Sequence, residues 1–470
     1  VYAKEVDKGL QLDVIYNSGL YTHSRMEVLL QHFEHVLRVV AENADICVGD
    51  IQLGVGVSAG VVAGVVGEFD DYGVSPDEEL ISEYTDVLED IALSYERSGN
   101  SVALQCVNES WSYDELNTNV NLLANYITNH TASGSKIALV ASRTANLPVG
   151  VLAILNANCT FCLIDASYPA NKIRSYLDTF KADFVLVDSD RDLVLANGDV
   201  KNPLYTWLDT WLDTEFKNRH FILPNNKKGF SELSITNPEN VLLNRNLPAG
   251  NVAYFSFTSG TLGEPKLVAC DLAPLSHFVT WYKQEFKLQS NDCFSMLSGV
   301  SHDPILRDIF TPLSMGATIC ITQQNELLEP GYLSDWIKDN NISVAHLSPS
   351  MGELMVQSWK QEAPELRLVC FGGEKMRFSQ AKTFTEFSPN AQLVNVYGAT
   401  ETPQVMAYER VDIEQSMGRS SIIPIGVGID GVQVLVVNDS LRPVGASEIG
   451  EIVIRTPYLS LGYENDESLS

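Results

Sequence analysis

From about residue 80 onward, short apolar runs alternate with amphipathic stretches, and this alternation constrains the fold more than any other feature. Apolar residues that recur every three or four positions predict helices over residues 80–95 and 115–130. Short apolar runs between helical stretches are typical of buried parallel strands, so we expect an α/β protein with helices flanking parallel sheets. The predicted strands cover residues 136–141, 160–164, 184–187, 318–321, 344–347, 367–371 and 393–396.

Two later segments depart from this alternation. Residues 197–250 are polar and irregular, which predicts a surface segment. After Glu409 the apolar runs at residues 433–437 and 451–455 follow one another closely, which predicts a small separate β element. The sequence contains no internal repeat.

The first 79 residues are expected to form two further parts. Residues 1–52 predict one strand (10–16) and one helix (26–41), which cannot bury a core alone, so they are expected to end a preceding domain. Residues 53–79 are expected to be a linker. The uncharged glycine-rich stretch 51–67 is shorter than the roughly 20 residues of a membrane span, which favours a linker over a membrane helix. The chain begins without Met and stops within a pattern, so we expect a fragment of a longer protein.

Composition excludes several classes of function. The 470 residues predict about two to four domains. A formal net charge of −29 argues against a nucleic-acid partner and against docking on an anionic membrane. Eight scattered cysteines without a secretory signal favour the cytoplasm. Cys159 and Cys162 form a C-x-x-C motif, but their apolar neighbours predict a buried strand rather than a redox or metal site.

The strongest local motif covers residues 254–266, where an apolar strand runs into a turn rich in Ser, Thr and Gly and then into Lys266. Backbone N–H groups and hydroxyls in such a turn can hold phosphate oxygens, and a lysine adds positive charge. The spacing differs from that of a Walker A loop. The alternative interpretation is an ordinary polar turn after a strand.

Two more motifs follow predicted strands. Tyr397 and Glu401 lie at the end of the strand 393–396, where ligands of open α/β sheets bind. An aromatic ring there can stack on a base, and a carboxylate can bind Mg²⁺. Gly372 and Gly373, before Glu374, would let a ligand approach the backbone closely, although most such turns are only turns.

A fourth motif carries opposite charges in an apolar setting. If Pro304 begins a helix, Asp303 and Arg307 lie on one face of it. Apolar neighbours on both sides favour a buried or pocket-lining pair over a surface ion pair, and a buried arginine needs an anionic partner. His346 lies in another predicted strand and is either part of the same site or a satisfied core histidine.

Taken in order, these motifs resemble the adenylation domains of nonribosomal peptide synthetases and their relatives. Residues 111–117, 155–165 and 450–454 extend the resemblance. It implies the large lobe of the adenylate-forming fold over residues 80–470, and residues 1–52 resemble the end of a condensation-type domain. Within this superfamily, residues 294–313 and 344–352 resemble the L-2-aminoadipate reductase family of fungal lysine biosynthesis.

The resemblance implies ATP-dependent adenylation of the side-chain carboxyl of aminoadipate, followed in the whole protein by transfer to a phosphopantetheine thiol on a carrier domain and reduction with NADPH. A phosphopantetheinyl transferase would act on that carrier. In this chain the resemblance implies catalytic roles for Thr258, Lys266 and Glu401, with Glu401 binding Mg²⁺. ATP would contact Ser259, Gly260, Thr261, Gly263, Gly372, Gly373, Glu374, Asn395, Tyr397, Gly398 and Thr400. The amino acid would contact His302, Asp303, Arg307 and His346.

The chain departs from the family pattern at Leu267, Ala399 and Pro403. The resemblance implies a C-terminal lobe with a catalytic lysine that residues 1–470 do not include, so we expect these residues alone to bind ATP but to adenylate slowly. Three alternatives stay open: a nonribosomal peptide synthetase domain for another amino acid, an acyl-CoA or aryl-acid ligase, and a protein that only binds a nucleotide or a partner.

Overall fold

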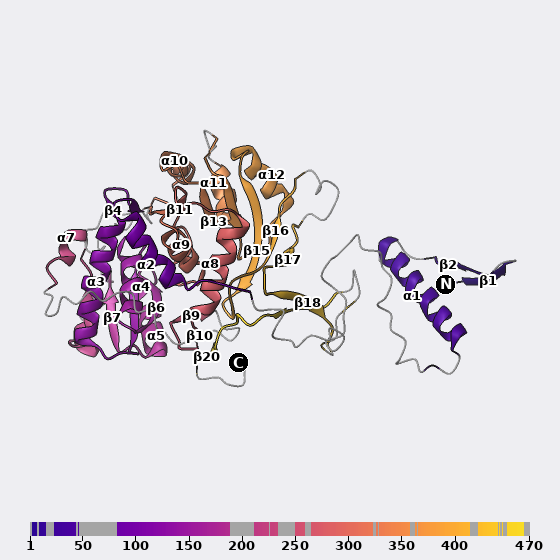
Figure 1. The fold of residues 1–470 in the computed structure, drawn as a ribbon, viewed down its shortest axis with the longest axis horizontal. Helices are drawn as coiled ribbons and strands as arrows, with labels where there is room; N and C mark the ends of the chain where they lie inside the picture. The colour runs from indigo at the N-terminus through magenta and orange to yellow at the C-terminus, as the bar shows by residue number, and fades with distance from the viewer. Residues whose placement is uncertain are drawn as a thin grey trace. The chain divides into compact units, whose positions relative to one another are not determined.

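The computed structural model divides the chain into two compact units, coloured along the chain in Figure 1. The first unit is Val1–Glu79 with Gln433–Arg455, and the second is Leu80–Val432 with Thr456–Ser470. The structure describes residues 2–6, 9–15, 23–43, 46, 82–188, 211–224, 226–233, 250–258, 265–322, 326–327, 329–357, 362–363, 365–413, 422–439, 441, 444 and 449–464. The glycine-rich stretch 51–67 lies outside these ranges, so its role as a linker stays a prediction.

The described residues of the first unit form two short hairpins and one long helix. Strands β1 (Tyr2–Val6) and β2 (Gly9–Asp13) pair antiparallel, and helix α1 (His23–Glu42) follows. The predicted helix 26–41 is confirmed, the predicted strand 10–16 corresponds to β2, which ends at Asp13, and β1 was not predicted. Strands β18 (Gln433–Val437) and β19 (Glu451–Arg455) pair antiparallel as a two-stranded sheet, which confirms both predicted strands near the end of the chain.

A seven-stranded sheet forms one half of the second unit. Its central strands are parallel, whereas β10 pairs antiparallel with both β9 and β20. The strand order is β20-β10-β9-β6-β5-β7-β8. In chain order these strands are β5 (Lys136–Ala141), β6 (Thr160–Asp165), β7 (Phe184–Val187), β8 (His220–Ile222), β9 (Tyr254–Thr258), β10 (Lys266–Cys270) and β20 (Gly462–Tyr463).

A nine-stranded sheet forms the other half. It is parallel from β3 to β15, and antiparallel strands close both edges. The order is β17-β16-β15-β14-β13-β11-β12-β3-β4. Its strands are β3 (Val102–Gln105), β4 (Ser110–Ser112), β11 (Cys293–Ser295), β12 (Thr318–Cys320), β13 (Val344–Leu347), β14 (Leu368–Phe371), β15 (Gln392–Ala399), β16 (Thr402–Arg410) and β17 (Val427–Gly428).

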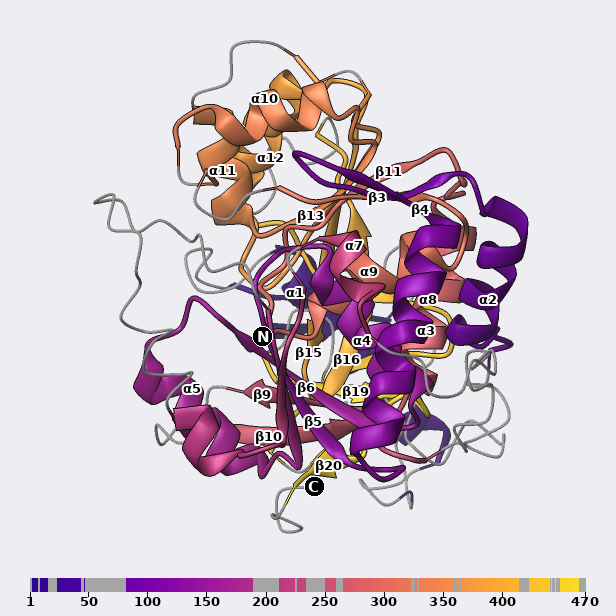
Figure 2. The ribbon, with the colours of Figure 1, turned by 90° about the vertical axis from the view of Figure 1, so that its left-hand side faces the viewer.

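Helices cover the faces of both sheets, and Figure 2 shows α10, α11 and α12 gathered in one group. Apolar residues of α5 join one face of the seven-stranded sheet in a buried cluster, and α10, α11 and α12 do the same for the nine-stranded sheet. Among the described residues, the helices of the second unit include α2 (Val87–Ser98), α3 (Tyr113–His130), α4 (Asn146–Asn156), α5 (Ala170–Phe180), α7 (Lys227–Phe230), α8 (Ala273–Glu285), α9 (Pro304–Leu313), α10 (Tyr332–Asp339), α11 (Pro349–Gln357) and α12 (Phe378–Phe387).

The predicted α/β pattern is confirmed, with two corrections. The helix predicted over residues 80–95 begins only at Val87, because the Asp86 carboxylate accepts the N–H of Leu88 and so caps the helix there. Residues 197–250 are not irregular throughout, since β8 pairs in parallel with β7 and α7 follows it. The polar composition of this segment gives no clear strand or helix pattern. In the structure, β8 is stabilised by its pairing with β7.

The cysteine motif lies in the core, as its apolar neighbours predicted. Cys162 is part of β6, both thiols are free, and both side chains are buried. Burial raises the pKa of Cys162, so its thiol stays protonated and unreactive. Among the helices that the structure describes, none combines the length and apolar character that crossing a bilayer requires.

Candidate nucleotide and amino-acid site

The predicted phosphate-binding motif spans the hairpin of β9 and β10. Thr258 ends β9 and lies opposite Lys266, which begins β10. Both side chains are half-buried. The predicted ligands Ser259, Gly260, Thr261 and Gly263 lie between them, outside the described residues, and so stay predictions. The register therefore places Thr258 and Lys266 opposite one another at the same end of two neighbouring strands.

The two glycines after β14 are favoured for different reasons, close packing at Gly372 and a positive φ at Gly373. A Cβ atom on Gly372 would lie 2.9 Å from Cγ2 of Val396 in the neighbouring strand β15, and Gly373 has a φ of 81°. That φ favours glycine over any residue with a side chain. The carboxylate of Glu374 accepts a hydrogen bond from Oγ of Ser350 at 2.5 Å. The turn therefore presents bare backbone beyond the end of the parallel strand, as the sequence predicted.

Asn395 and Gly398 of β15 contribute mainly to the structure of this edge. The side-chain amide of Asn395 is buried and donates to the carbonyl of Pro424 at 2.7 Å. A Cβ on Gly398 would lie 2.4 Å from the carbonyl oxygen of Gln404, so only glycine fits at this bulge. Tyr397, between them, is half-buried and faces no such restriction.

Thr400 and Glu401 form the turn between β15 and β16, and both are half-buried. Oε1 of Glu401 accepts a hydrogen bond from the hydroxyl of Tyr463 in β20. The described residues contain no group of three or more His, Cys, Asp or Glu side chains fit for a metal. Magnesium beside a nucleotide commonly uses only one or two carboxylates together with phosphate oxygens, so a single glutamate suits it. We call Thr258, Lys266, Tyr397 and Glu401 the strand-end group.

Asp303 precedes α9 and is buried. Pro304 is the first residue of that helix, as predicted. Oδ2 of Asp303 accepts the backbone N–H of Gln404 at 3.2 Å, and its carbonyl accepts the side-chain amide of Gln404 at 3.1 Å. Burial raises the pKa of Asp303 to about 6, while the hydrogen bond from Gln404 and the positive charge of Arg307 act in the opposite direction.

Arg307 lies one turn further along α9 and is only 6% exposed. Its Nε has no hydrogen-bond partner among the described residues. A Cβ on Gly372 would lie 4.0 Å from Nη2 of Arg307, so the guanidinium reaches the glycine turn after β14. A buried guanidinium that lacks a partner is costly unless an anion binds it. The structure thus brings Arg307 close to both Asp303 and Gly372.

Gln404 completes this second group and was missed by the sequence analysis. It is buried, its backbone φ is 69°, and its side-chain oxygen has no partner among the described residues. The only feature of the local sequence that could have indicated a site residue is its position three residues after Glu401. Asp303, Arg307 and Gln404, which we call the α9 group, offer a carboxylate, a guanidinium and an amide oxygen with unused bonding capacity.

His346, predicted to contact the amino acid, has both ring nitrogens bonded within the protein. It is buried, with Nδ1 2.7 Å from Oδ1 of Asp308 and Nε2 3.0 Å from the hydroxyl of Tyr282. A carboxylate only accepts, so Nδ1 carries the proton, and Tyr282 donates to Nε2. Burial lowers the pKa of His346, which therefore stays neutral. Asp308 also accepts the N–H groups of Leu297 and Ser298.

This geometry makes His346 a support for α9 rather than a free ligand. Because Asp308 follows Arg307 directly, the bond from His346 ties this part of α9 to β13. His302, also predicted to contact the amino acid, precedes Asp303 and is exposed. Its contact with a ligand stays a prediction.

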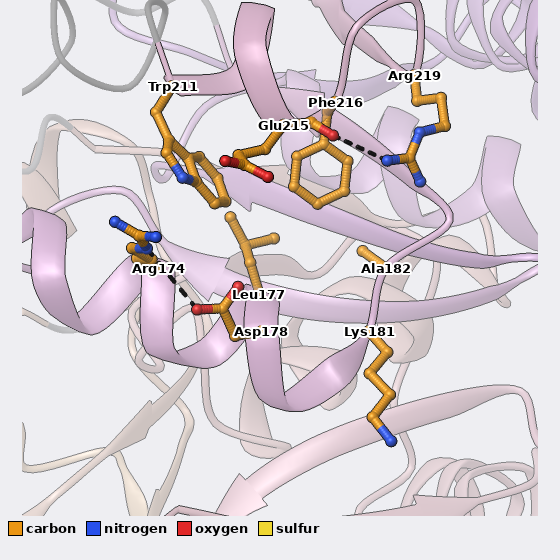
Figure 3. Close-up of a pocket in the computed structure, with 9 residues that line it drawn as sticks. All are labelled: Arg174, Leu177, Asp178, Lys181, Ala182, Trp211, Glu215, Phe216 and Arg219. Atoms are coloured by element: carbon orange, nitrogen blue, oxygen red, sulfur yellow. Dashed lines mark hydrogen bonds and ion pairs between the residues drawn. The ribbon is translucent and has the colours of Figure 1, made fainter.

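The surface pocket of Figure 3 is separate from both groups. It has a volume of about 220 Å³ and lies over α5 and residues 211–219. Arg174 pairs with Asp178 at 3.8 Å, and Arg219 donates to the carbonyl of Glu215 at 2.8 Å. None of the predicted site residues lines this pocket.

Comparison with known proteins supports the α/β adenylate-forming fold that the sequence predicted. Residues 91–464 match the family model described as AMP-binding enzyme. L-2-aminoadipate reductase of Saccharomyces cerevisiae is 29% identical over 96% of this chain and 33% of its own length, so the chain spans only about a third of that relative. Gramicidin S synthase 2 of Brevibacillus brevis is 27% identical over 99% of this chain and 10% of its own length.

Among solved structures, the nonribosomal peptide synthetase FmoA3 aligns with a TM-score of 0.74 at 20% identity, over 96% of this chain and 45% of that chain. At this identity the match shows the fold alone, and that fold is the α/β adenylate-forming fold with two mixed sheets. Since the family model also covers most of the residues that the structure describes, the chain belongs to the AMP-binding enzyme family.

Proposed function

We propose that this chain carries the large adenylating lobe of an L-2-aminoadipate reductase and activates the side-chain carboxyl of aminoadipate with ATP. In this reaction a carboxylate oxygen bonds to the α-phosphorus of ATP, the bond to the β-phosphate breaks, and pyrophosphate leaves. Lys266 and Thr258 would hold phosphate oxygens, and Tyr397 would lie against the adenine. Magnesium bound at Glu401 would neutralise phosphate charge.

The observation that carries the choice of substrate is the buried Arg307, whose Nε lacks a partner within the described part of the chain. If the distal carboxyl is adenylated, the α-amino and α-carboxyl groups must lie away from the nucleotide. Asp303 would then bind the ammonium, and Arg307 would bind the α-carboxylate through paired hydrogen bonds. Gln404 adds an amide oxygen that can accept one further N–H of the ammonium.

The second candidate is a nonribosomal peptide synthetase domain that activates another amino acid at its α-carboxyl, which the likeness to gramicidin S synthase 2 favours. In that case the substrate side chain, rather than the α-carboxylate, would meet Arg307. An acidic side chain such as that of glutamate would suit the guanidinium, whereas an apolar side chain would leave it unpaired and buried.

The remaining steps belong to the whole protein. We propose that residues 1–52 form the end of a condensation-like domain and that residues 80–470 form the adenylating lobe. Residues 53–79 would link the two. A carrier domain, loaded by a phosphopantetheinyl transferase, would take the acyl group as a thioester, and NADPH would reduce it. The free cysteines among the described residues suit the cytoplasm, and the proposed activity would belong to lysine biosynthesis.

The test is amino-acid-dependent exchange of pyrophosphate with ATP by the full-length protein. Aminoadipate, glutamate, lysine and several apolar amino acids would be compared. We expect exchange with aminoadipate to exceed that with every other amino acid. Exchange with a different amino acid alone would move the protein to peptide synthesis, and the absence of exchange with all of them would leave nucleotide or partner binding as its function.

A further inference from the structure

The segment that ends in β20 contacts Glu401 at two points. The backbone N–H of Ser460 donates to the carbonyl of Glu401 at 3.1 Å. The hydroxyl of Tyr463 donates to the carboxylate oxygen Oε1 of the same residue. Both the backbone and the side chain of Glu401 are therefore bonded to residues that follow it by about 60 positions.

The same segment is bonded to the strand that Lys266 begins. Tyr463 pairs with Val268 of β10, and the N–H of Glu464 donates to the carbonyl of Leu267 at 2.8 Å. Nζ of Lys266 lies 5.3 Å from the centre of the Tyr463 ring, within the range of a cation–π contact. Tyr463 thus touches the carboxylate and the ammonium of the strand-end group, which come from different sheets.

We propose that Tyr463 is a positioning residue of the metal–nucleotide site, which orients the Glu401 carboxylate for Mg²⁺ while its strand holds Lys266 in register. This inference rests on the proposed adenylation, because it takes Glu401 as the magnesium ligand. The hydroxyl engages one carboxylate oxygen and leaves the other oxygen to the metal. Outer-shell hydrogen bonds of this kind orient metal ligands, and their removal typically lowers metal affinity by about 10–100-fold.

The chemistry of the pair suits this role. A phenol keeps its proton at neutral pH, so the hydroxyl of Tyr463 donates to the carboxylate of Glu401. A carboxylate has about four lone-pair sites, so donation by Tyr463 does not exhaust its capacity to bind a metal. The fixed donor would also restrict rotation of the half-buried carboxylate.

The test is calorimetric binding of ATP to the Tyr463→Phe variant, in Mg²⁺ and in EDTA. The variant keeps the ring, the strand pairing and the contact with Lys266. We expect the dissociation constant in Mg²⁺ to rise about tenfold, with no change in EDTA. The matched control is Tyr458→Phe, which removes a hydroxyl from the same segment that bonds to the carbonyl of Ser82 instead. It should leave both constants unchanged.

A double variant sharpens the test. In a Glu401→Gln background, Tyr463→Phe should weaken ATP binding in Mg²⁺ by less than twofold further, since the oriented charge is already gone. Equal affinities of wild type and Tyr463→Phe in Mg²⁺, or equal losses in Mg²⁺ and EDTA, would overturn the inference, as would binding by the wild type that ignores Mg²⁺. Circular dichroism melts would verify that each variant is folded.

Failure of this inference can be told apart from failure of the proposed function. Wild-type protein that binds Mg-ATP but exchanges pyrophosphate with no amino acid would overturn the proposed function, while the effect of Tyr463→Phe on binding could still be measured. Active exchange with unchanged binding in Tyr463→Phe would overturn only the role of Tyr463.

Discussion

The strand-end group and the α9 group differ in how far water reaches them. Thr258, Lys266 and Glu401 are half-buried at strand ends, so part of each residue remains open to solvent. Asp303, Arg307 and Gln404 are buried, and two of them keep atoms without partners. A solvated group can bind the nucleotide shared by a whole family, whereas a buried group with unmet bonding capacity discriminates among substrates.

The largest effect that would test this contrast is expected for Arg307→Met. Loss of a buried cation from a carboxylate typically costs 2–5 kcal/mol, so kcat/KM for aminoadipate in pyrophosphate exchange should fall about 10²–10³-fold. The affinity for ATP should not change. The melting temperature of the free protein should change little, because removal of the unpartnered Nε is offset by loss of the positive charge that faces the buried carboxylate of Asp303.

Arg367→Met is the matched control for that substitution. Arg367 pairs with Asp292 at 2.5 Å, and its loss leaves a buried carboxylate without its cation. The melting temperature should therefore fall, while the preference for aminoadipate stays. Equal losses of ATP and aminoadipate affinity in Arg307→Met would break the contrast between the two groups.

The next largest effect is expected for Asp308, which bonds α9 to the neighbouring strand β13 through His346. Asp308→Ala removes the acceptor of His346, Leu297 and Ser298 in the core, which should lower the free energy of unfolding by about 3 kcal/mol. Urea denaturation would measure the loss. Once corrected for the folded fraction, exchange with aminoadipate and with glutamate should fall equally. A loss confined to aminoadipate would make Asp308 part of substrate selection.

Glu401→Gln should weaken the strand-end group without affecting the α9 group. Removal of the charge from a carboxylate that binds a metal is expected to cost about 1.5–3 kcal/mol, or roughly 10–100-fold in ATP affinity in the presence of Mg²⁺. The ratio of kcat/KM for aminoadipate and glutamate should not change. A changed ratio would show that the two groups are coupled.

The smallest effect is a dependence on pH. Burial raises the pKa of Asp303 to about 6, so this group stabilises the fold below its unfolded pKa, and the contribution is lost as the pH rises through about 6. Substrate affinity should change in the opposite direction, because an ammonium needs the ionised carboxylate. KM for aminoadipate should rise about tenfold for each pH unit below 6.

Asp303→Asn provides the comparison for that profile. The KM of this variant for aminoadipate should be high at every pH and should not show the rise below pH 6 that is expected of the wild type. Its melting temperature relative to the wild type should increase between pH 5 and pH 8. A wild-type KM that stays constant from pH 5 to pH 8 would contradict ionisation of Asp303 as the cause.

The sequence by itself determined the α/β class, most strands, the order of the motifs and the start of α9 at Pro304. These features depend on periodicity, on proline geometry and on short motifs, all of which are local. Only the tertiary structure decided that Gln404 bonds to Asp303 and that Tyr463 bonds to Glu401. It likewise decided that the carboxylate of Asp308 accepts a hydrogen bond from the ring of His346. These contacts join residues 38 to 101 positions apart. They arise where strands of two sheets and α9 converge, and no local pattern encodes that meeting.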